Sequence, residues 1–193
     1  MPSTARRTAS KPVTIAEYDA FVDAQDDDTK YELVNGVIVM MTTPTQAHGL
    51  IAANIAAPLN FAMDRRGCMT FIGGMAVQRS DDPTDTEKTI PDIVVRRGTM
   101  EKRSSLTDPL VVVEILSPST MDLDRGWKLD FYKSLPTLRH IVLVYQDEMR
   151  AEHYRRTEQK WDIAVLKAAD DLLHFDAVDF RLDLGSVYRS VVF

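Results

Sequence analysis

Apolar residues spaced three or four positions apart predict helices over about residues 14–24, 45–66 and 120–134. The first segment begins with Thr14-Ile-Ala-Glu17, a capping box in which a hydroxyl and a carboxylate satisfy backbone N–H groups at the helix start. The third segment carries an apolar stripe made of Leu123, Trp127, Phe131 and Leu135. We expect these helices to pack against a sheet through their apolar faces.

Runs of β-branched and other apolar residues predict strands around these helices. Within residues 31–40, Asn35-Gly36 separates two short apolar runs, which is the sequence signature of a tight hairpin turn. Further strands are expected over residues 69–78, 90–96, 110–116, 139–145, 150–157, 161–167 and 176–182. This order of elements predicts an α/β (α+β mixed) fold, a mixed central sheet flanked by helices.

The chain has the composition of a soluble globular protein, with 45% hydrophobic and 27% charged residues. No repeat or linker divides it, which predicts one domain over residues 13–193 after a flexible N-terminal tail, residues 1–12. Its single cysteine, Cys68, excludes a disulfide-stapled scaffold and a cysteine-based zinc domain, and favours the cytoplasm. We find no apolar stretch long enough to span a membrane.

The charge balance limits how the protein could hold a nucleic acid. Its 23 basic and 29 acidic residues give a net charge of −6, so the average surface repels phosphate. A nucleic-acid partner would need a local basic patch or bound metal ions. Three basic pairs are candidates for such a patch: Arg65-Arg66, Arg96-Arg97 and Lys102-Arg103.

Two acidic residues interrupt apolar strands, where a lone carboxylate is costly. Glu114 lies in the apolar run 110–116, on the same strand face as Val112 and Leu116. Asp92 occupies the equivalent position in the neighbouring run 90–96. A buried carboxylate must be neutralised, paired or bound to a cation. Either each acid pairs with an arginine, for which Arg79, Arg96 and Arg139 are available, or the two acids share a metal ion.

Oxygen ligands without a cysteine or a histidine pair favour a hard cation, Mg²⁺ or Mn²⁺, over zinc. Glu32, in the first strand of the predicted hairpin, is a third acidic candidate. Lys128 lies about 60° from the centre of the apolar stripe on the third helix, if each residue adds about 100°. Its amine could extend to solvent or pair with Asp124 one turn earlier. Alternatively, beside the metal-binding acids, it could orient a water molecule or hold a phosphate oxygen.

These residues together resemble the Uma-two family of restriction-endonuclease-like proteins, which belongs to the PD-(D/E)XK nuclease superfamily. The resemblance is carried by Pro91-Asp92, by Val113-Glu114-Ile-Leu-Ser-Pro-Ser-Thr120, by Lys128 and Tyr132, and by Tyr31-Glu-Leu-Val-Asn-Gly36. It extends over roughly residues 14–193. The fold that it implies, a restriction-endonuclease-like mixed sheet with helices on both sides, agrees with the strand and helix pattern.

The resemblance implies a metal-dependent endonuclease that hydrolyses phosphodiester bonds of DNA. Asp92, Glu114 and the main-chain carbonyl of Ile115 would bind Mg²⁺ or Mn²⁺, and Glu32 would be an accessory acid. Leu116 stands where the parent motif has its lysine, so the resemblance assigns that catalytic role to Lys128. Because a duplex requires two cuts and related proteins pair, we expect a homodimer acting on DNA.

Other functions are compatible with parts of the sequence. A nuclease fold can serve as a catalytically idle nucleic-acid or protein-binding module. A glycosidase with paired carboxylates is disfavoured because few aromatic residues lie near Asp92 and Glu114. His48, at the start of the second helix, is interpreted as a capping or local hydrogen-bonding group and is left out of the catalytic set.

Overall fold

A computed structural model describes residues 11–26, 29–117, 121 and 124–193. Most of the predicted tail, residues 1–10, therefore lies outside the described residues. The start of the third predicted helix, including Leu123 of its apolar stripe, also lies outside them. None of the described helices is long and apolar enough to cross a membrane.

The main sheet has six strands in the order β11-β10-β9-β8-β6-β3. The pair β8·β9 is parallel, and the other neighbouring pairs are antiparallel, so the predicted mixed sheet is confirmed. The strands are β3 (Cys68–Ile72), β6 (Ile93–Arg97), β8 (Pro109–Leu116), β9 (His140–Tyr145), β10 (Ala151–Arg156) and β11 (Trp161–Leu166). β8 and β9 are buried on both faces, as their nearly continuous apolar sequences require.

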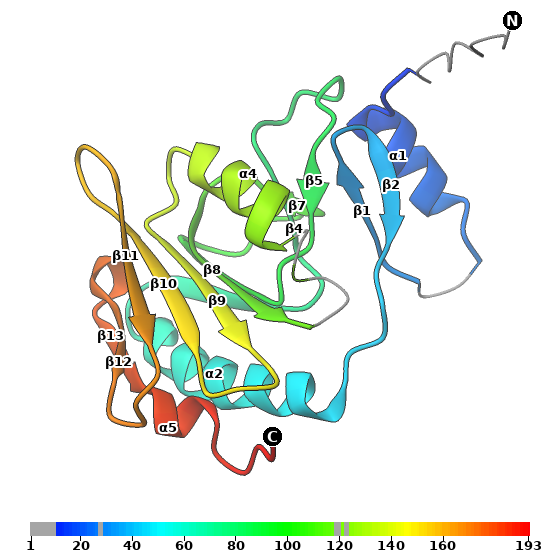
Figure 1. Cartoon of the computed structure of the whole chain (residues 1–193). Coiled ribbons are helices and arrows are strands. Elements are labelled where there is room, and N and C mark those ends of the chain that lie inside the picture. Colours follow the sequence, from blue (N-terminus) through cyan, green and yellow to red (C-terminus); the bar gives the residue numbers. More distant parts are fainter. Residues whose placement is uncertain (1–10, 27–28, 118–120, 122–123) are drawn as a thin grey trace, which may run out of the picture.

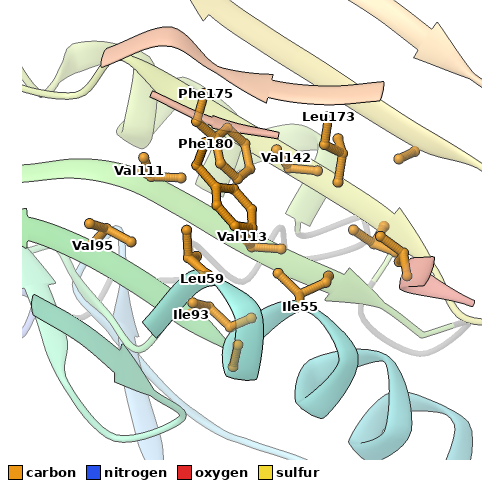
Figure 2. Packing of buried hydrophobic residues seen from close by; sticks show 14 of the residues in the cluster. Ile55, Leu59, Ile93, Val95, Val111, Val113, Val142, Leu173, Phe175 and Phe180 are labelled. Atoms are coloured by element: carbon orange, nitrogen blue, oxygen red, sulfur yellow. The ribbon is translucent and has the colours of Figure 1, made fainter. Parts of the chain in front are cut away.

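One face of this sheet packs against α2 (Gln46–Asp64), which runs below the strands in Figure 1. Ile55 and Leu59 of α2 point toward Ile93 and Val113 of the sheet (Figure 2). The C-terminal elements complete the cover of this face: β12 (Leu172–Phe175), the short 3₁₀ turn η2 (Asp176–Val178), β13 (Phe180–Asp183) and α5 (Leu184–Val187).

The opposite face is covered by a widened helical turn, the π-helix η1 (Asp124–Lys128), and by α4 (Leu129–Ser134), which lies above the sheet in Figure 1. Val112 and Leu116 of β8 belong to the same buried cluster as Phe131 and Tyr132 of α4. Glu114, between Val112 and Leu116 on this strand face, is therefore directed into a covered layer, as the alternation predicts.

A second sheet has five short strands in the order β2-β1-β5-β4-β7. The hairpin turn predicted at Asn35-Gly36 is confirmed, because both residues have positive φ angles, 49° and 74°. The Thr14 capping box is also present at the start of α1. The elements of this region are α1 (Ile15–Asp23), β1 (Tyr31–Val34), β2 (Val37–Met40), β4 (Ala76–Gln78), β5 (Lys88–Thr89) and β7 (Ser105–Leu106).

Two details of the predicted elements are wrong. The single strand expected over 69–78 is split into β3 and β4, which lie in different sheets. The break falls at Gly73, whose φ of 51° lies in the left-handed region that glycine tolerates. The strand expected over 176–182 begins only at Phe180, after η2.

The fold contains a buried histidine pair that predicts acid sensitivity. The Nδ1 atom of His140 lies 3.1 Å from the Nε2 atom of His153. Burial lowers the pKa of His140 to about 4, and burial together with the charge of His140 lowers the pKa of His153 to about 3. Both values lie below the unfolded value of about 6.5, so the unfolded chain binds protons first as the pH falls.

We therefore expect the free energy of unfolding to fall between pH 6.5 and pH 4, by about 3 kcal/mol for one such histidine. His153→Gln removes one of the two buried histidines and should make the free energy of unfolding depend less on pH in this range. Urea denaturation at a series of pH values measures it. Parallel curves for His153→Gln and the wild type would contradict the prediction.

Candidate functional site

The carboxylate of Glu114 is buried near the end of β8 and receives two hydrogen bonds. The hydroxyl of Tyr132 donates to its Oε1 atom at 2.5 Å, and the amine of Lys128 donates to the same atom at 3.3 Å. Both donors come from the helical cover of the sheet, Lys128 from η1 and Tyr132 from α4. The cost of burying the carboxylate is thus offset by a hydroxyl and a cation.

The amine of Lys128 lies among three carboxylates from three different elements. Its Nζ atom is 3.0 Å from Glu32 on β1, 3.1 Å from Asp124 on η1 and 3.3 Å from Glu114 on β8. The side chain of Lys128 is only 5% exposed, and each of the three acidic side chains is 4% exposed. Lys128 thus lies within ion-pair distance of three buried carboxylates and donates a hydrogen bond to Glu114.

Glu32 connects the second sheet to this cluster. Its Oε1 atom accepts hydrogen bonds from the hydroxyl of Thr89 at 2.5 Å and from the backbone N–H of Ile90 at 2.8 Å. The Thr89 hydroxyl also lies 3.3 Å from the hydroxyl of Tyr132. The second oxygen of Glu32 is therefore held in place to face Lys128.

Asp92 lies just before β6, at the edge of the main sheet where β8 ends. Its Oδ2 atom accepts a hydrogen bond from the backbone N–H of Ile115 at 2.7 Å, which places the carboxylate beside the backbone of the residue that follows Glu114. Its Oδ1 atom lies 3.1 Å from the Nε2 atom of His48 on α2. The side chains of Asp92 and His48 are each 17% exposed, so this part of the site reaches solvent.

The electrostatics of the cluster are those of a buried cation surrounded by acids. Burial raises the pKa of Glu114 well above its usual value, the charge of Lys128 opposes this, and the nearby acids Asp124, Asp92 and Glu32 raise the pKa further. Burial alone would lower the pKa of Lys128, but the acids Glu114, Glu32 and Asp124 outweigh it and raise the pKa well above its usual value. Lys128 is therefore firmly protonated.

The structure brings the residues predicted from the sequence into one region. Glu32, Glu114 and Lys128 are in direct contact, and Asp92 is joined to the backbone next to Glu114. Two of the three alternative arginine partners are engaged elsewhere. Arg79 pairs with Glu87, and Arg96 pairs with Asp108 at 2.8 Å.

Two further residues of the cluster follow from the structure. Asp124 and Lys128 pair within η1, so the pairing considered in the sequence coexists with the contacts to Glu32 and Glu114. The interpretation of His48 as a cap is wrong, because the hydroxyl of Thr45 caps α2 by accepting the backbone N–H of His48. The imidazole of His48 is left to reach Asp92. The spacing Thr45-x-x-His48 at the start of the predicted helix is the sequence signal that Thr45, and not His48, is the cap.

The basic pairs considered as flanks of a nucleic-acid groove lie away from this edge. Arg65-Arg66 follows α2 at the end opposite to His48, and a helix of this length spans about 28 Å. Arg96 is buried and pairs with Asp108, which precedes the first residue of β8, and with Glu101, which also pairs with Arg103. The acidic cluster, by contrast, lies at the other end of β8.

The donor set suits a hard divalent cation. Asp92 and Glu114 supply carboxylate oxygens, and Ile115 carries a main-chain carbonyl on the strand side where its N–H meets Asp92. Among the described residues, no three His, Cys, Asp or Glu side chains form a ready-made metal cage. Mg²⁺ is commonly held by one or two carboxylates together with substrate phosphates, so two acidic side chains are sufficient. The residues therefore fit such an ion.

Comparison with known proteins supports the resemblance found in the sequence. A family model, Uma2, described as "Putative restriction endonuclease", matches residues 15–185. Two uncharacterized proteins of Synechocystis sp. are similar over most of their lengths. The protein slr1290 is 25% identical over 167 residues, 85% of this chain and 86% of that protein, and sll1609 is 24% identical over 172 residues, 86% of this chain and 94% of that protein.

A solved structure has a similar fold. It is described as "a putative nuclease belonging to DUF820" from Anabaena variabilis, with a TM-score of 0.73. The match covers 94% of this chain and 100% of that chain at 19% sequence identity. At this identity the similarity is one of fold.

The geometry predicts that Lys128 is a determinant of stability. Lys128→Met retains the length of the side chain but leaves three buried carboxylates without their cation, which should cost about 3–5 kcal/mol of the free energy of unfolding. The loss should be larger at pH 8 than at pH 5, because burial raises the folded pKa of Glu114, and protonation of this carboxyl at lower pH relieves its repulsion from the neighbouring acids. Urea denaturation at both pH values measures the effect.

Lys133→Met is the matched control. Lys133 lies one turn further along the same helical segment and rests over the ring of Tyr154, 4.9 Å from its centroid. Its replacement should cost about 1 kcal/mol or less at either pH. Equal losses in the two variants would show that the acidic cluster does not depend on Lys128.

Proposed function

Because this chain belongs to the Uma2 family, we propose that it is a metal-dependent endonuclease that hydrolyses phosphodiester bonds of DNA at a PD-(D/E)XK-type site. The observation that supports the site is the meeting of four predicted residues at one sheet edge. Lys128 contacts Glu32 and Glu114, and Asp92 is hydrogen-bonded to the backbone N–H of Ile115.

Asp92, Glu114 and the main-chain carbonyl of Ile115 would hold Mg²⁺ or Mn²⁺. When bound, such an ion supplies Lewis-acid charge to a phosphate and lowers the pKa of a coordinated water. The ion would also resolve the charge problem of the sequence, since an acidic site in a chain of net charge −6 repels phosphate without it. His48 restrains the outer oxygen of Asp92, which is the more exposed of the two acids.

Lys128 would offset charge on the phosphate. Its ammonium lies within ion-pair distance of three carboxylates, so it would have to move away from one of them to contact a phosphate oxygen. Its contact with Glu114, at 3.3 Å, is the longest of the three. Glu32 and Asp124 would then keep the ammonium in place while one donor turns to the substrate. Glu32 would thus have the accessory role expected from the sequence.

Cleavage of both strands of a duplex would require two such sites, so we also propose that two chains act together as a homodimer. The site residues of one chain gather near the carboxyl end of β8 and form one centre, so one chain presents one centre to DNA. Light scattering coupled to size-exclusion chromatography, with and without a DNA duplex, measures the state of association.

Removal of either proposed metal ligand should abolish cleavage. We expect Asp92→Asn and Glu114→Gln to lower the rate of plasmid nicking in Mg²⁺ or Mn²⁺ by about 100-fold or more, with circular dichroism unchanged. Chelation by EDTA should stop the wild type. Asp108→Asn is the matched control, because Asp108 precedes β8 at its other end and pairs with Arg96, far from Glu114. Cleavage by Glu114→Gln at the wild-type rate would refute the site.

A measurement of metal binding distinguishes the proposed nuclease from a catalytically idle binding module. Mn²⁺ at about 100 times its Kd should raise the unfolding free energy of the wild type by about 3 kcal/mol. Asp92→Asn should abolish most of this gain, whereas Asp108→Asn should retain it. Isothermal titration calorimetry and thermal unfolding measure both. A wild type that binds DNA but neither metal would favour the binding module.

A further inference from the structure

A second glutamate, Glu152 on β10, is buried on the same face of the main sheet as Glu114. Its side chain is 4% exposed, and four donors surround it. The hydroxyls of Tyr145 and Tyr154 donate to it at 2.8 Å and 2.9 Å, and Arg150 donates at 2.8 Å. Arg125 of η1 forms an ion pair with it at 3.2 Å. This carboxylate lies outside the acidic cluster, and the proposed chemistry does not use it.

The strand register relates Glu152 to Glu114. Leu143 on β9 is the partner of Glu114 on β8 and also of Glu152 on β10. Residues directly opposite each other on adjacent strands project to the same face. The two glutamates therefore lie in one row across the sheet, two strand spacings or about 10 Å apart. Leu143 between them is fully buried.

The π-helical turn η1 contacts both ends of this row. Lys128 pairs with Glu114, and Arg125, three positions earlier, pairs with Glu152. A third contact holds Trp127, which also lies in η1. Its indole N–H donates a hydrogen bond to Glu87 at 2.8 Å. The turn that carries Lys128 and Asp124 is thus attached to the sheet at a second buried carboxylate, away from the reacting groups.

We propose that Arg125 and Glu152 are positioning residues that set the place of η1, and through it the place of Lys128 and Asp124, over the end of β8. The catalytic consequence rests on the proposed function, but the mechanical role does not. A displacement of about 1 Å at a catalytic group can lower a rate by about 100-fold. An ion pair to a fixed carboxylate is a direct way to prevent such a shift.

Arg150 makes a discriminating control possible. Arg125 and Arg150 pair with the same oxygen of Glu152, but Arg150 belongs to the connection between β9 and β10, whereas Arg125 belongs to η1. Arg125→Ala and Arg150→Ala therefore remove similar charges from the same carboxylate. The side chain of Arg125 is 46% exposed, and Glu152 keeps its two tyrosine donors, so both variants should fold.

The chain has two tryptophans, and Trp127 lies between Arg125 and Lys128 in η1. In a Trp161→Phe background, acrylamide quenching of Trp127 reports the mobility of this turn directly. We expect Arg125→Ala to raise the quenching constant about twofold, and Arg150→Ala to leave it unchanged. Arg125→Lys should restore most of the protection, because a cation still reaches Glu152.

The catalytic readout is plasmid cleavage by the full chain. Arg125→Ala should lower kcat about tenfold with KM unchanged, Arg150→Ala should change neither, and Arg125→Lys should recover much of the rate. Equal quenching in the two alanine variants would overturn the proposal, as would a quenching change without loss of kcat in a chain that cleaves DNA. If the wild type cleaves no DNA, the proposed function fails while the quenching comparison still decides whether Arg125 holds η1.

Discussion

The site depends on one interaction, the placement of the Lys128 ammonium among three buried carboxylates. Glu32, Glu114 and Asp124 come from β1, β8 and η1, so this cation joins the second sheet, the main sheet and the helical cover. Without it, three acids would meet in a region from which water is largely excluded, and their mutual repulsion would oppose folding. A lysine that the proposed chemistry needs is therefore also one on which the fold depends.

The edge of the main sheet explains why the remaining site residues gather where they do. β8 and β9 run in parallel, so their carboxyl ends lie at the same edge, and the antiparallel β6 begins there. Asp92, just before β6, consequently meets the backbone of Ile115 near the end of β8. The start of α2 is fixed at this edge by the hydroxyl of Thr45, which donates to Gln146 after β9 at 2.6 Å. His48, in the first turn of α2, is thereby brought to Asp92.

Much of this arrangement could be predicted from the sequence because it follows local rules. The capping box at Thr14, the Asn35-Gly36 turn and the alternation around Glu114 each depend on neighbouring residues alone. The contacts that local rules leave open are those between distant elements. The pairing of His48 with Asp92 depends on where α2 begins relative to β6, and the row of Glu114 and Glu152 depends on the register of three strands. The widening of η1 has no marker in the residue pattern, and the split at Gly73 depends on which sheet each half joins.

The same geometry implies a competition within the site. The Oε1 atom of Glu114 already accepts Tyr132 and Lys128, so a divalent cation at Glu114 must share this carboxylate with the lysine. Burial raises the pKa of Glu114, and a nearby divalent charge would oppose that shift and favour the ionised ligand. If the proposed site binds a metal ion, its affinity would be set by how far Lys128 can withdraw toward Glu32 and Asp124 without leaving the cluster. That distance is limited by η1, which carries both Lys128 and Asp124 and is joined to Glu152 through Arg125. A rigid turn would keep the lysine close enough to act on a phosphate, and a loose one would release the lysine together with Asp124. In the proposed nuclease, the attachment of η1 would therefore bear on metal binding as well as on catalysis.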